Sequence, residues 1–384
     1  MATKKKIYLD YNATTPVELE VVEAMLPYFT EKFGNASSDH VFGWDADEAV
    51  EIAREQISNL VNCRPNVITF TSGATEAANL ALFGFCEKYK AKGKHIITCK
   101  TEHKAILDTM KALESQDFEV TYLDVDAQGN IDLRELEKSI NSETILVCLM
   151  LANNETGLIH PIKQISELVH SKGVKLMSDI TQAVGKISVN LKELNLDLAV
   201  FSSHKIYGPK GVGALYTNKE NNVELHPQVF GGGQEKGIRP GTLNVPGIVG
   251  FGKAAEIADA ELKAGYKKAI KLRDKLEALL EDIEGLQINS KNCDRLPNTT
   301  NITFKNFEGS HLLRKLNRLA VSRGSACSAN TIQASHVLKA MGLNDEQALS
   351  SLRISIGKDT SLADIEFAAE EIKQTIASLK TATV

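Results

Sequence analysis

Short β-type runs alternate with helical runs through much of the first half of the chain, and this alternation restricts the fold more than any other feature. The β-type runs are apolar segments bounded by polar or small residues, at 66–71, 95–99, 119–123, 144–149, 174–178 and 196–201. Hydrophobic residues recur at helical spacing between these runs, over 45–62, 74–90, 104–116 and 161–172. Strands that alternate with helices form a mostly parallel sheet with helices on both faces. The pattern therefore predicts an α/β fold.

The alternation ends at Pro246. A long helical stretch then covers 247–284, and Gly265 is its weak point because glycine disfavours helix interiors. The remainder reads as strand, helix, strand and a last helix over 361–379. We therefore expect two domains. They are a large α/β domain at 15–258 and a smaller α+β domain made of 1–14 and 259–384.

Composition and charge exclude several classes of partner. Lys and Arg total 44 against 49 Asp and Glu, so the net charge is −5, whereas nucleic-acid binders usually carry a basic surface. No apolar run approaches the roughly 18 residues of a membrane span, and no long apolar signal core follows Met1. We therefore expect a cytoplasmic protein that contacts neither nucleic acid nor membrane.

Zinc and nucleotide sites are not expected either. The six cysteines, at 63, 86, 99, 148, 293 and 327, never form a Cys-x-x-Cys pair, and most lie in apolar surroundings. Residues 247–253 have the spacing of a phosphate-binding loop, but Ala254 replaces the Ser or Thr that would bind magnesium. No Gly-x-Gly-x-x-Gly motif follows a β-type run. The sequence therefore predicts no metal site and no dinucleotide site.

A turn of small residues, 71–76, joins a predicted strand to a predicted helix. Small residues there leave the backbone N–H groups at the start of the helix open to a phosphate, and Thr75, next to Ala74, adds a hydroxyl donor. An ordinary strand-to-helix turn has the same composition. The segment is therefore a candidate phosphate site that needs further support.

Two polar residues follow the strand predicted at 174–178. Asp179 ends this strand, at the edge where ligands bind in open α/β sheets. Its carboxylate is suited either to pairing with a ring-nitrogen cation or to capping the segment that follows. Gln182 is close enough to donate a hydrogen bond to an oxygen beside such a ring.

Lys205 follows the strand predicted at 196–201, in a turn that also contains Ser202 and His204. A lysine directly after a buried strand is costly unless it is paired or neutralised. A Schiff base with an aldehyde removes that cost and gives the lysine a chemical task. A surface turn rich in Gly and Lys is the alternative. Phosphate cradle, strand-end Asp179 and strand-end Lys205 together predict a pyridoxal phosphate site.

With these residues in place, the chain closely resembles the cysteine desulfurases, in the class V branch of fold-type I pyridoxal phosphate enzymes. The resemblance covers nearly the whole chain, in motifs at 8–16, 71–76, 101–103, 153–157, 203–211, 231–242, 324–327 and 352–357. It is strongest to the subgroup with a long cysteine loop. It implies a large domain with a mostly parallel sheet, a smaller α+β domain, and pyridoxal 5'-phosphate as cofactor.

The resemblance also implies how the cofactor is held. Lys205 would form the Schiff base and carry protons once substrate releases it, and His103 would stack on the ring as an acid–base group. Asp179 would keep the ring nitrogen protonated, and Gln182 would bond the ring hydroxyl oxygen. The phosphate would be held by the residues of the cradle and the lysine turn, Ala74, Thr75, Ser202 and His204.

The remaining implied roles concern substrate and subunits. Arg353 would clamp the substrate carboxylate, a task that suits its bidentate guanidinium, and Asn154 would assist near the substrate and ring. Thr242 would reach the phosphate of the neighbouring subunit's cofactor, which implies a homodimer with shared sites.

Cys327 is the candidate nucleophile. It lies in the small, polar segment 322–330, where a thiol without a packing role is a candidate for reactivity, although a simple loop cysteine is the alternative. The resemblance implies that its thiolate attacks the sulfur of cofactor-bound L-cysteine, leaving a persulfide on Cys327 and forming alanine. A protein acceptor such as an iron–sulfur scaffold would then take the sulfur. Arg323 stands where many members have serine, and its charge would act on the thiol or the acceptor surface.

Three other activities fit parts of this pattern. A selenocysteine lyase shares the cofactor site and releases its product without a persulfide. An aminotransferase does not need Cys327 and yields an α-keto acid. A non-catalytic sulfur-carrier platform is disfavoured, because buried charges cost free energy and a site without catalytic function would not need them. We therefore expect a homodimeric cysteine desulfurase.

Overall fold

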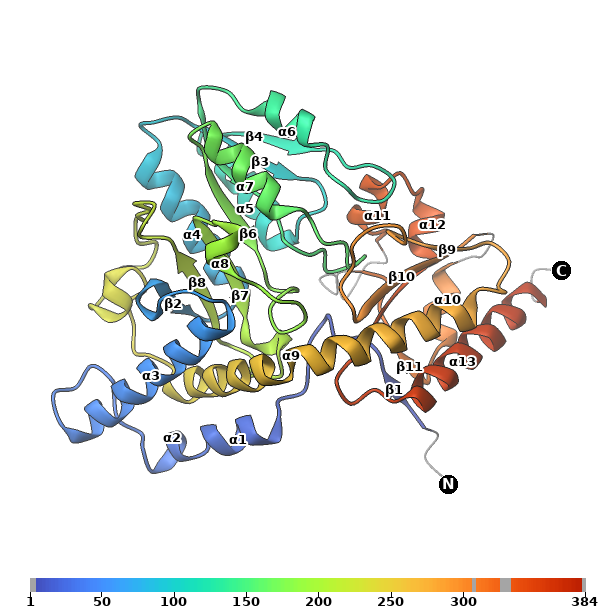
Figure 1. Cartoon of the computed structure of the whole chain (residues 1–384), viewed down its shortest axis with the longest axis horizontal. Helices are drawn as coiled ribbons and strands as arrows, with labels where there is room; N and C mark the ends of the chain where they lie inside the picture. Colours follow the sequence, from blue (N-terminus) through green and yellow to red (C-terminus); the bar gives the residue numbers. More distant parts are fainter. Residues whose placement is uncertain (1–4, 306–308, 325–332, 382–384) are drawn as a thin grey trace.

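The computed structural model describes residues 5–305, 309–324 and 333–381, arranged as two bodies along one long helix (Figure 1). The larger body contains a seven-stranded sheet, and the smaller one a three-stranded sheet. The shared helix is α9 (Val245–Leu280), which is continuous through Gly265. No helix in the described ranges is long and apolar enough to cross a membrane.

The seven-stranded sheet has the order β2-β8-β7-β6-β5-β3-β4. Its strands are β2 (Ile68–Thr71), β3 (His95–Cys99), β4 (Glu119–Leu123), β5 (Thr144–Cys148), β6 (Lys175–Asp179), β7 (Leu198–Ser202) and β8 (Gly213–Thr217). β3 to β7 run parallel, whereas β8 is antiparallel to both of its neighbours, β2 and β7. The predicted mostly parallel α/β sheet is confirmed. The sequence analysis did not identify β8, which directly follows a turn rich in Gly and Lys.

Helices cover both faces of this sheet because alternate strand residues are apolar on both sides. Ile96 and Leu146 pack with α4 (Ala74–Tyr89) and α5 (Lys104–Glu114) in one hydrophobic cluster. Ile97 and Val147 lie in the cluster on the opposite face. That face is covered by α3 (Val41–Leu60), α6 (Leu133–Ser139), α7 (Ile162–Ser171), α8 (Leu191–Leu194) and the first half of α9.

Predicted helices agree with observed helices to within a few residues, and α3 shows how the differences arise. It begins at Val41 rather than at 45, because the His40 ring accepts a hydrogen bond from the Gly43 N–H at 3.3 Å and caps the helix. Ahead of α3, the short helices α1 (Leu19–Met25) and α2 (Pro27–Thr30) lie along α9 at the lower edge of Figure 1.

The smaller body brings both ends of the chain together. Its antiparallel sheet consists of β9 (Leu286–Ile288), β10 (Thr299–Phe304) and β12 (Ser351–Ser355). Close to it, β1 (Ile7–Tyr8) pairs in parallel with β11 (Leu319–Ala320), so N-terminal residues lie among C-terminal ones. The remaining helices are α10 (Gly309–Lys315), α11 (His336–Ala340), α12 (Asp345–Leu349) and α13 (Leu362–Thr381). The domain limits at 14/15 and 258/259 stay a prediction.

Candidate active site

A cavity of about 530 Å³ lies where the parallel strands of the large sheet end. Its wall contains every predicted site residue that the structure describes except Thr242. These residues are Ala74, Thr75, His103, Asn154, Asp179, Gln182, Ser202, His204, Lys205 and Arg353. They come from segments far apart in the sequence, so the fold brings together what the sequence analysis had selected one motif at a time.

The cradle between β2 and α4 depends on two glycines. Gly73 has φ +155°, and the Cα of Gly73 would lie 2.6 Å from a side-chain carbon added to Gly213. Glycine is therefore required where β8 passes beneath the turn. The first residues of α4, Ala74 and Thr75, line the cavity, so the unpaired N–H groups of the helix start face it.

Lys205 and His204 lie in a 3-10 turn, Ser203–Lys205, directly after β7. The Lys205 amine donates hydrogen bonds to the carbonyl oxygens of Asn12 and Ala13, both at 2.7 Å. The His204 ring contacts the Thr14 hydroxyl at 3.1 Å. Burial, helped by nearby lysine charges including Lys205, lowers the pKa of His204 to about 4. His204 is therefore neutral at pH 7.

Asp179 ends β6 as predicted, and the capping interpretation is confirmed. Its Oδ1 accepts a hydrogen bond from the Thr181 N–H at 2.9 Å, so the carboxylate does cap the following turn. The same side chain lines the cavity. Nearby, the Gln182 amide donates from Nε2 to the Asn12 carbonyl at 3.0 Å, and its Oε1 accepts from the Lys186 amine at 2.5 Å.

His103 caps the start of α5 and lines the cavity. Its Nδ1 accepts a hydrogen bond from the Ala105 N–H at 3.1 Å, so the neutral ring carries its proton on Nε2. Burial lowers the pKa of His103 from its ordinary value of 6.5, and the charges of Lys205 and His336 lower it further against Asp179. The ring is therefore neutral at pH 7.

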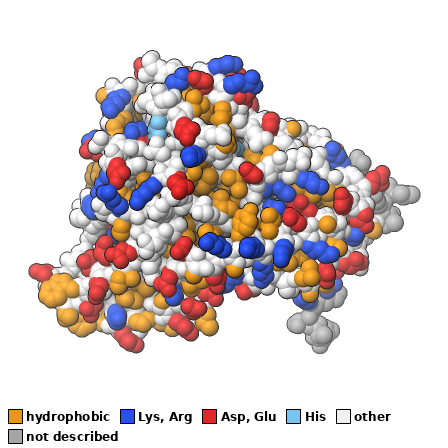
Figure 2. Space-filling view, viewed as in Figure 1, with side chains coloured by type: hydrophobic (Ala, Val, Ile, Leu, Met, Phe, Trp, Pro, Cys, Tyr) orange, Lys and Arg blue, Asp and Glu red, His pale blue; other side chains and the backbone are white. Residues whose placement is uncertain are grey.

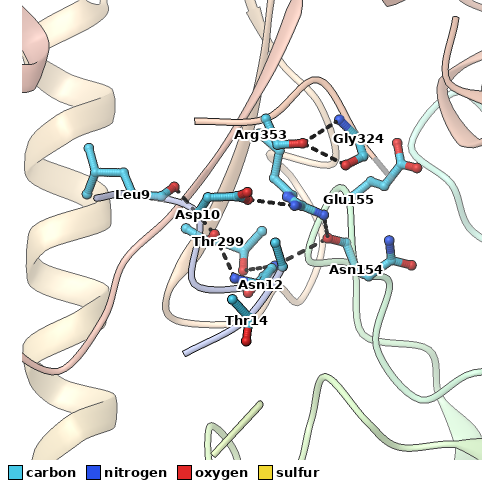
Figure 3. Close-up of polar contacts among 12 residues, drawn as sticks. Leu9, Asp10, Asn12, Thr14, Asn154, Glu155, Thr299, Gly324 and Arg353 are labelled. Carbon is cyan, nitrogen blue, oxygen red and sulfur yellow. Dashed lines mark hydrogen bonds and ion pairs between the residues drawn. The ribbon is translucent and has the colours of Figure 1, made fainter. Parts of the chain in front are cut away.

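Arg353 enters the cavity from β12, almost fully buried at 2% exposure. One terminal nitrogen donates to Asp10 Oδ1 at 2.6 Å, and the other donates to the Asn154 carbonyl at 3.1 Å (Figure 3). Among the described residues its buried Nε has no hydrogen-bond partner. The guanidinium is held in place yet keeps free donors, as an anion site requires.

Thr242 is the one predicted site residue in the described ranges that does not line the cavity. Thr242 is exposed and lies outside the cavity wall of its own chain. Cys327 lies outside the described residues. On the near side of that gap, a side chain placed on Gly324 would meet the Glu155 carboxylate at 2.5 Å, and on the far side Ser335 donates to the same carboxylate at 2.5 Å.

Four other cysteines are unsuited to nucleophilic attack. Burial raises the pKa of Cys63 and Cys86 to about 12 and that of Cys99 to about 11, and it raises the pKa of Cys148 as well. These thiols stay protonated at neutral pH, and the thiolate is the reactive form. They pack in the core, as the sequence analysis expected.

Sequence reasoning missed four polar residues around this cavity: Asp10, Asn12, Lys186 and His336. Asn12 lies within the 8–16 motif, but nothing in that run indicated that its carbonyl would meet Lys205. Lys186 and His336 belong to no recognisable sequence motif. The folded backbone brings them close to the site. His336 donates from its ring to the Glu102 carbonyl, at 2.9 Å, directly beside His103.

Comparison with known proteins decides the family. The model of the family described as aminotransferase class-V matches residues 7–367. The chain belongs to this family. Among curated relatives, it is 47% identical to "Cysteine desulfurase IscS" of Anaeromyxobacter sp. (strain Fw109-5), across 98% of this chain and 94% of that protein. It is 49% identical to the protein of the same name from Neisseria meningitidis (strain FAM18), across 99% and 94%.

Solved structures of class-V proteins give the same result. A "NIFS-LIKE PROTEIN" superposes with a TM-score of 0.91 at 39% identity, over 97% of this chain and all of the other. The NifS-like protein from Rickettsia africae superposes with a TM-score of 0.87 at 34% identity, over 97% and 99%. The class-V chain therefore has the fold-type I architecture, and pyridoxal phosphate is its cofactor.

The cavity residues fit that cofactor. The N-terminus of the 16-residue helix α4 offers N–H donors to a phosphate, and Lys205 and Lys210 add positive charge at the cavity wall. The Asp179 carboxylate and the Lys205 amine line the same cavity, and they would suit a ring-nitrogen cation and an aldehyde respectively. The donor set thus matches phosphate, ring and aldehyde in turn.

Proposed function

We propose that this chain is a cysteine desulfurase that transfers the sulfur of L-cysteine, as a persulfide on Cys327, to a protein acceptor such as an iron–sulfur scaffold. The observation that carries the proposal is a single cavity that holds Lys205, Asp179, His103 and Arg353 in a class-V fold. Relatives that match along nearly the whole chain and bear the name cysteine desulfurase support it.

Pyridoxal phosphate, when bound, supplies an electron sink that weakens the bonds around the α-carbon of an attached amino acid. We assign the phosphate to Ala74, Thr75, Ser202 and His204, and the ring to Asp179, Gln182 and His103. Neutral His204 donates or accepts without adding charge. The Asp179 carboxylate keeps a proton on the ring nitrogen, because an adjacent anion stabilises a cation.

Lys205 and His103 handle protons in this proposal. The amine of Lys205 is within 2.7 Å of two carbonyl oxygens, which orient it when it is not bonded to the cofactor. His103 is neutral at pH 7, so it can take up a proton, and its capping bond from the Ala105 N–H holds the ring in one orientation.

Arg353 binds the substrate carboxylate. Asp10 and the Asn154 carbonyl each occupy one donor, so the guanidinium is fixed before substrate arrives. Donors that are already held in place lose little conformational entropy when a ligand binds, which favours affinity. Asn154 also lines the cavity, and we assign it to contacts near the substrate and the cofactor ring.

Sulfur transfer is assigned to Cys327. Its thiolate attacks the substrate sulfur and forms a sulfur–sulfur bond, while the Cβ–S bond of the substrate breaks and its electron pair remains with the carbon. Protonation of that carbon completes alanine, so one thiol and one cysteine give one persulfide and one alanine. The raised pKa values of Cys63, Cys86, Cys99 and Cys148 support Cys327 as the nucleophile.

A homodimer is part of the proposal. Large apolar side chains are exposed around α1, α2 and the start of α3: Leu19, Leu26, Phe29, Phe33, Phe42 and Trp44. Figure 2 shows hydrophobic side chains gathered at its lower left, where α1 and α2 lie in Figure 1. Contiguous apolar surface of this kind is typical of protein interfaces. An exposed Thr242 is available to a partner's phosphate site, and a cytoplasmic location is consistent with unpaired thiols.

The proposal is tested by exposing the purified protein to L-cysteine without reductant and analysing its peptides by mass spectrometry. We expect one added sulfur on the Cys327 peptide and an equal amount of alanine. Cys327→Ser should retain bound cofactor and form no alanine. Alanine without a modified Cys327 would contradict the persulfide step and favour a lyase, and an α-keto acid would favour an aminotransferase.

A further inference from the structure

Lys186 is a lysine amine placed behind the candidate active site. It follows the turn after β6 and lines a neighbouring cavity of about 420 Å³, which also touches Lys205. Burial lowers its pKa well below the usual value, and the charges of Lys205 and Arg353 lower it further. In the described part of the chain no carboxylate forms an ion pair with it. Burying an amine in such surroundings costs free energy unless the amine is hydrogen-bonded, so its partners matter.

The amine contacts two side-chain oxygens of the active-site wall. It donates to Gln182 Oε1 at 2.5 Å and to Asn12 Oδ1 at 3.3 Å. The Asn12 carbonyl accepts from Gln182 Nε2, so the oxygen end of the Gln182 amide is the one that meets the Lys186 amine, which donates to it. The oxygen faces Lys186, and the NH₂ group is left to face Asn12 and the cavity.

The same contacts reach Lys205 through Asn12. The Asn12 carbonyl accepts from both Gln182 Nε2, at 3.0 Å, and Lys205, at 2.7 Å. The Asn12 side chain accepts from Asn298 Nδ2 at 3.2 Å. It donates to the Thr299 hydroxyl at 2.9 Å (Figure 3). Lys186 is thus the donor that joins Gln182 and Asn12 into one rigid unit beneath Lys205.

We propose that Lys186 is a positioning residue, which holds the Gln182 amide with its N–H groups toward the cofactor ring and its oxygen away from it. This inference rests on the proposed function, in which Gln182 bonds the ring hydroxyl oxygen. Without Lys186 the bond from Gln182 Nε2 to the Asn12 carbonyl alone orients the amide, and the energy gap to the flipped state, in which an acceptor faces another acceptor, becomes smaller. Lys186 therefore acts through Gln182, without touching the cofactor.

The test is a double-mutant cycle on the dissociation constant of pyridoxal phosphate, measured by diluting the full-length holoenzyme and following the absorption of bound cofactor. Lys186→Met should weaken cofactor binding about tenfold, as should Gln182→Leu. The double variant should bind no more weakly than Gln182→Leu alone, because the two residues act as one unit. Lys163→Met, an exposed lysine on α7, is the matched control and should change nothing.

Lys186→Arg keeps a hydrogen-bond donor at this position, so it distinguishes the loss of the donor from a change in packing. The adjoining 420 Å³ cavity leaves room for the longer side chain, so this variant should bind the cofactor nearly as well as the native protein. Thermal unfolding of each variant checks that the fold is intact. If Lys186→Met folds poorly, Lys186→Arg and Gln182→Leu still decide the matter: loss of binding in Lys186→Arg would overturn the inference.

Two outcomes contradict the inference while leaving the proposed function untouched. One is unchanged cofactor affinity in Lys186→Met beside a clear loss in Gln182→Leu. The other is two losses that multiply in the double variant, which would mean that the residues act independently. If the native chain itself fails to bind pyridoxal phosphate, the proposed function fails first.

Discussion

Arg353 shows how a single buried charge can be kept ready for a ligand. Asp10 neutralises it at 2.6 Å, and the Asn154 carbonyl fixes the plane of the guanidinium. A buried arginine without such partners would be strongly destabilising. Because these contacts leave Nε and further N–H donors available, the same arrangement supports both stability and recognition of a carboxylate.

Replacing Arg353 with lysine keeps the positive charge but removes the planar guanidinium that can bind a carboxylate through two hydrogen bonds. We expect Arg353→Lys to raise the KM for L-cysteine about tenfold to a hundredfold, since a hydrogen bond to a charged group contributes about 1.5–3 kcal/mol. Steady-state kinetics check this, with cofactor occupancy measured on the same sample. Arg273→Lys is the matched control, because Arg273 is also buried but bonds to Leu296 and Asp274, outside the cavity. An unchanged KM in Arg353→Lys would show that the substrate carboxylate binds elsewhere.

His103 gives the site its expected dependence on pH. Its pKa lies below 6.5, so the neutral ring persists as the pH falls through 6.5, and the acid limb of kcat/KM should lie below that value. The charged groups that act on this ring come from four segments: Asp179, Lys205, Glu155 and His336. The largest influence on its pKa, however, is burial.

His336→Gln tests one of these influences. Glutamine can still donate a hydrogen bond to the Glu102 carbonyl but cannot become a cation. Removing a nearby positive charge raises the pKa of His103, so the acid limb should move to higher pH by a few tenths of a unit. A pH profile of kcat/KM measures this. A limb that stays in place, or moves to lower pH, would mean that His103 is not the group that titrates there.

At the scale of elements, α9 shows that one helix can tolerate glycine in two different ways. Gly252 packs against α3, where an added side-chain carbon would lie 2.5 Å from the Ala53 Cα. No atom of the described residues lies within 4 Å of the corresponding position on Gly265. The first glycine allows two helices to approach closely, whereas the second only weakens the helix, as the sequence analysis expected.

The two glycines should therefore respond in opposite directions to the same substitution. Gly265→Ala should raise the free energy of unfolding by about 0.5–1 kcal/mol, the usual gain in helix interiors. Gly252→Ala should lower it by about 1–3 kcal/mol, because the backbone of α3 would have to move. Denaturation of both holoenzyme variants in parallel measures the difference. Equal effects at the two sites would contradict this account of α3–α9 packing.

At the scale of the whole molecule, the exposed apolar surface on α1, α2 and α3 is the feature that a single chain leaves unexplained. Phe33 and Phe42 are 66% and 50% exposed, and their ring centroids are 5.8 Å apart. Exposed aromatic pairs of this kind suit a protein interface, where they gain the burial they lack in one chain.

The double variant Phe33→Glu, Phe42→Glu should therefore be monomeric by analytical ultracentrifugation, because burying two carboxylates at an interface is costly. It should also hold pyridoxal phosphate more weakly, since Thr242 of a second chain is proposed to contact the phosphate. Leu362→Glu, at an equally exposed apolar residue of the smaller body, should remain a dimer. A dimeric double variant would place the interface on another surface.

The architecture was predictable because its signals are local. Apolar strand runs and helical spacing each extend over roughly ten to twenty residues. The sequence therefore indicated the mostly parallel sheet, and the helix bounds agree to within a few residues, as at α3, which His40 caps. β8 was missed because it directly follows a turn rich in Gly and Lys, and because one of its two partners, β2, lies far earlier in the chain.

The same distinction holds for the site. The sequence alone determined which reactive groups the chain carries and at which strand ends they lie, Asp179 after β6 and Lys205 after β7. Only the tertiary structure decided their partners: Asn12 beneath Lys205, Asp10 on Arg353 and Lys186 on Gln182. The first two contacts join residues more than 190 positions apart. The third contact, between Lys186 and Gln182, is local in the sequence. It matters for the site because both residues also bond to Asn12. Hydrogen bonds depend on distances in space, and a linear pattern does not contain those distances.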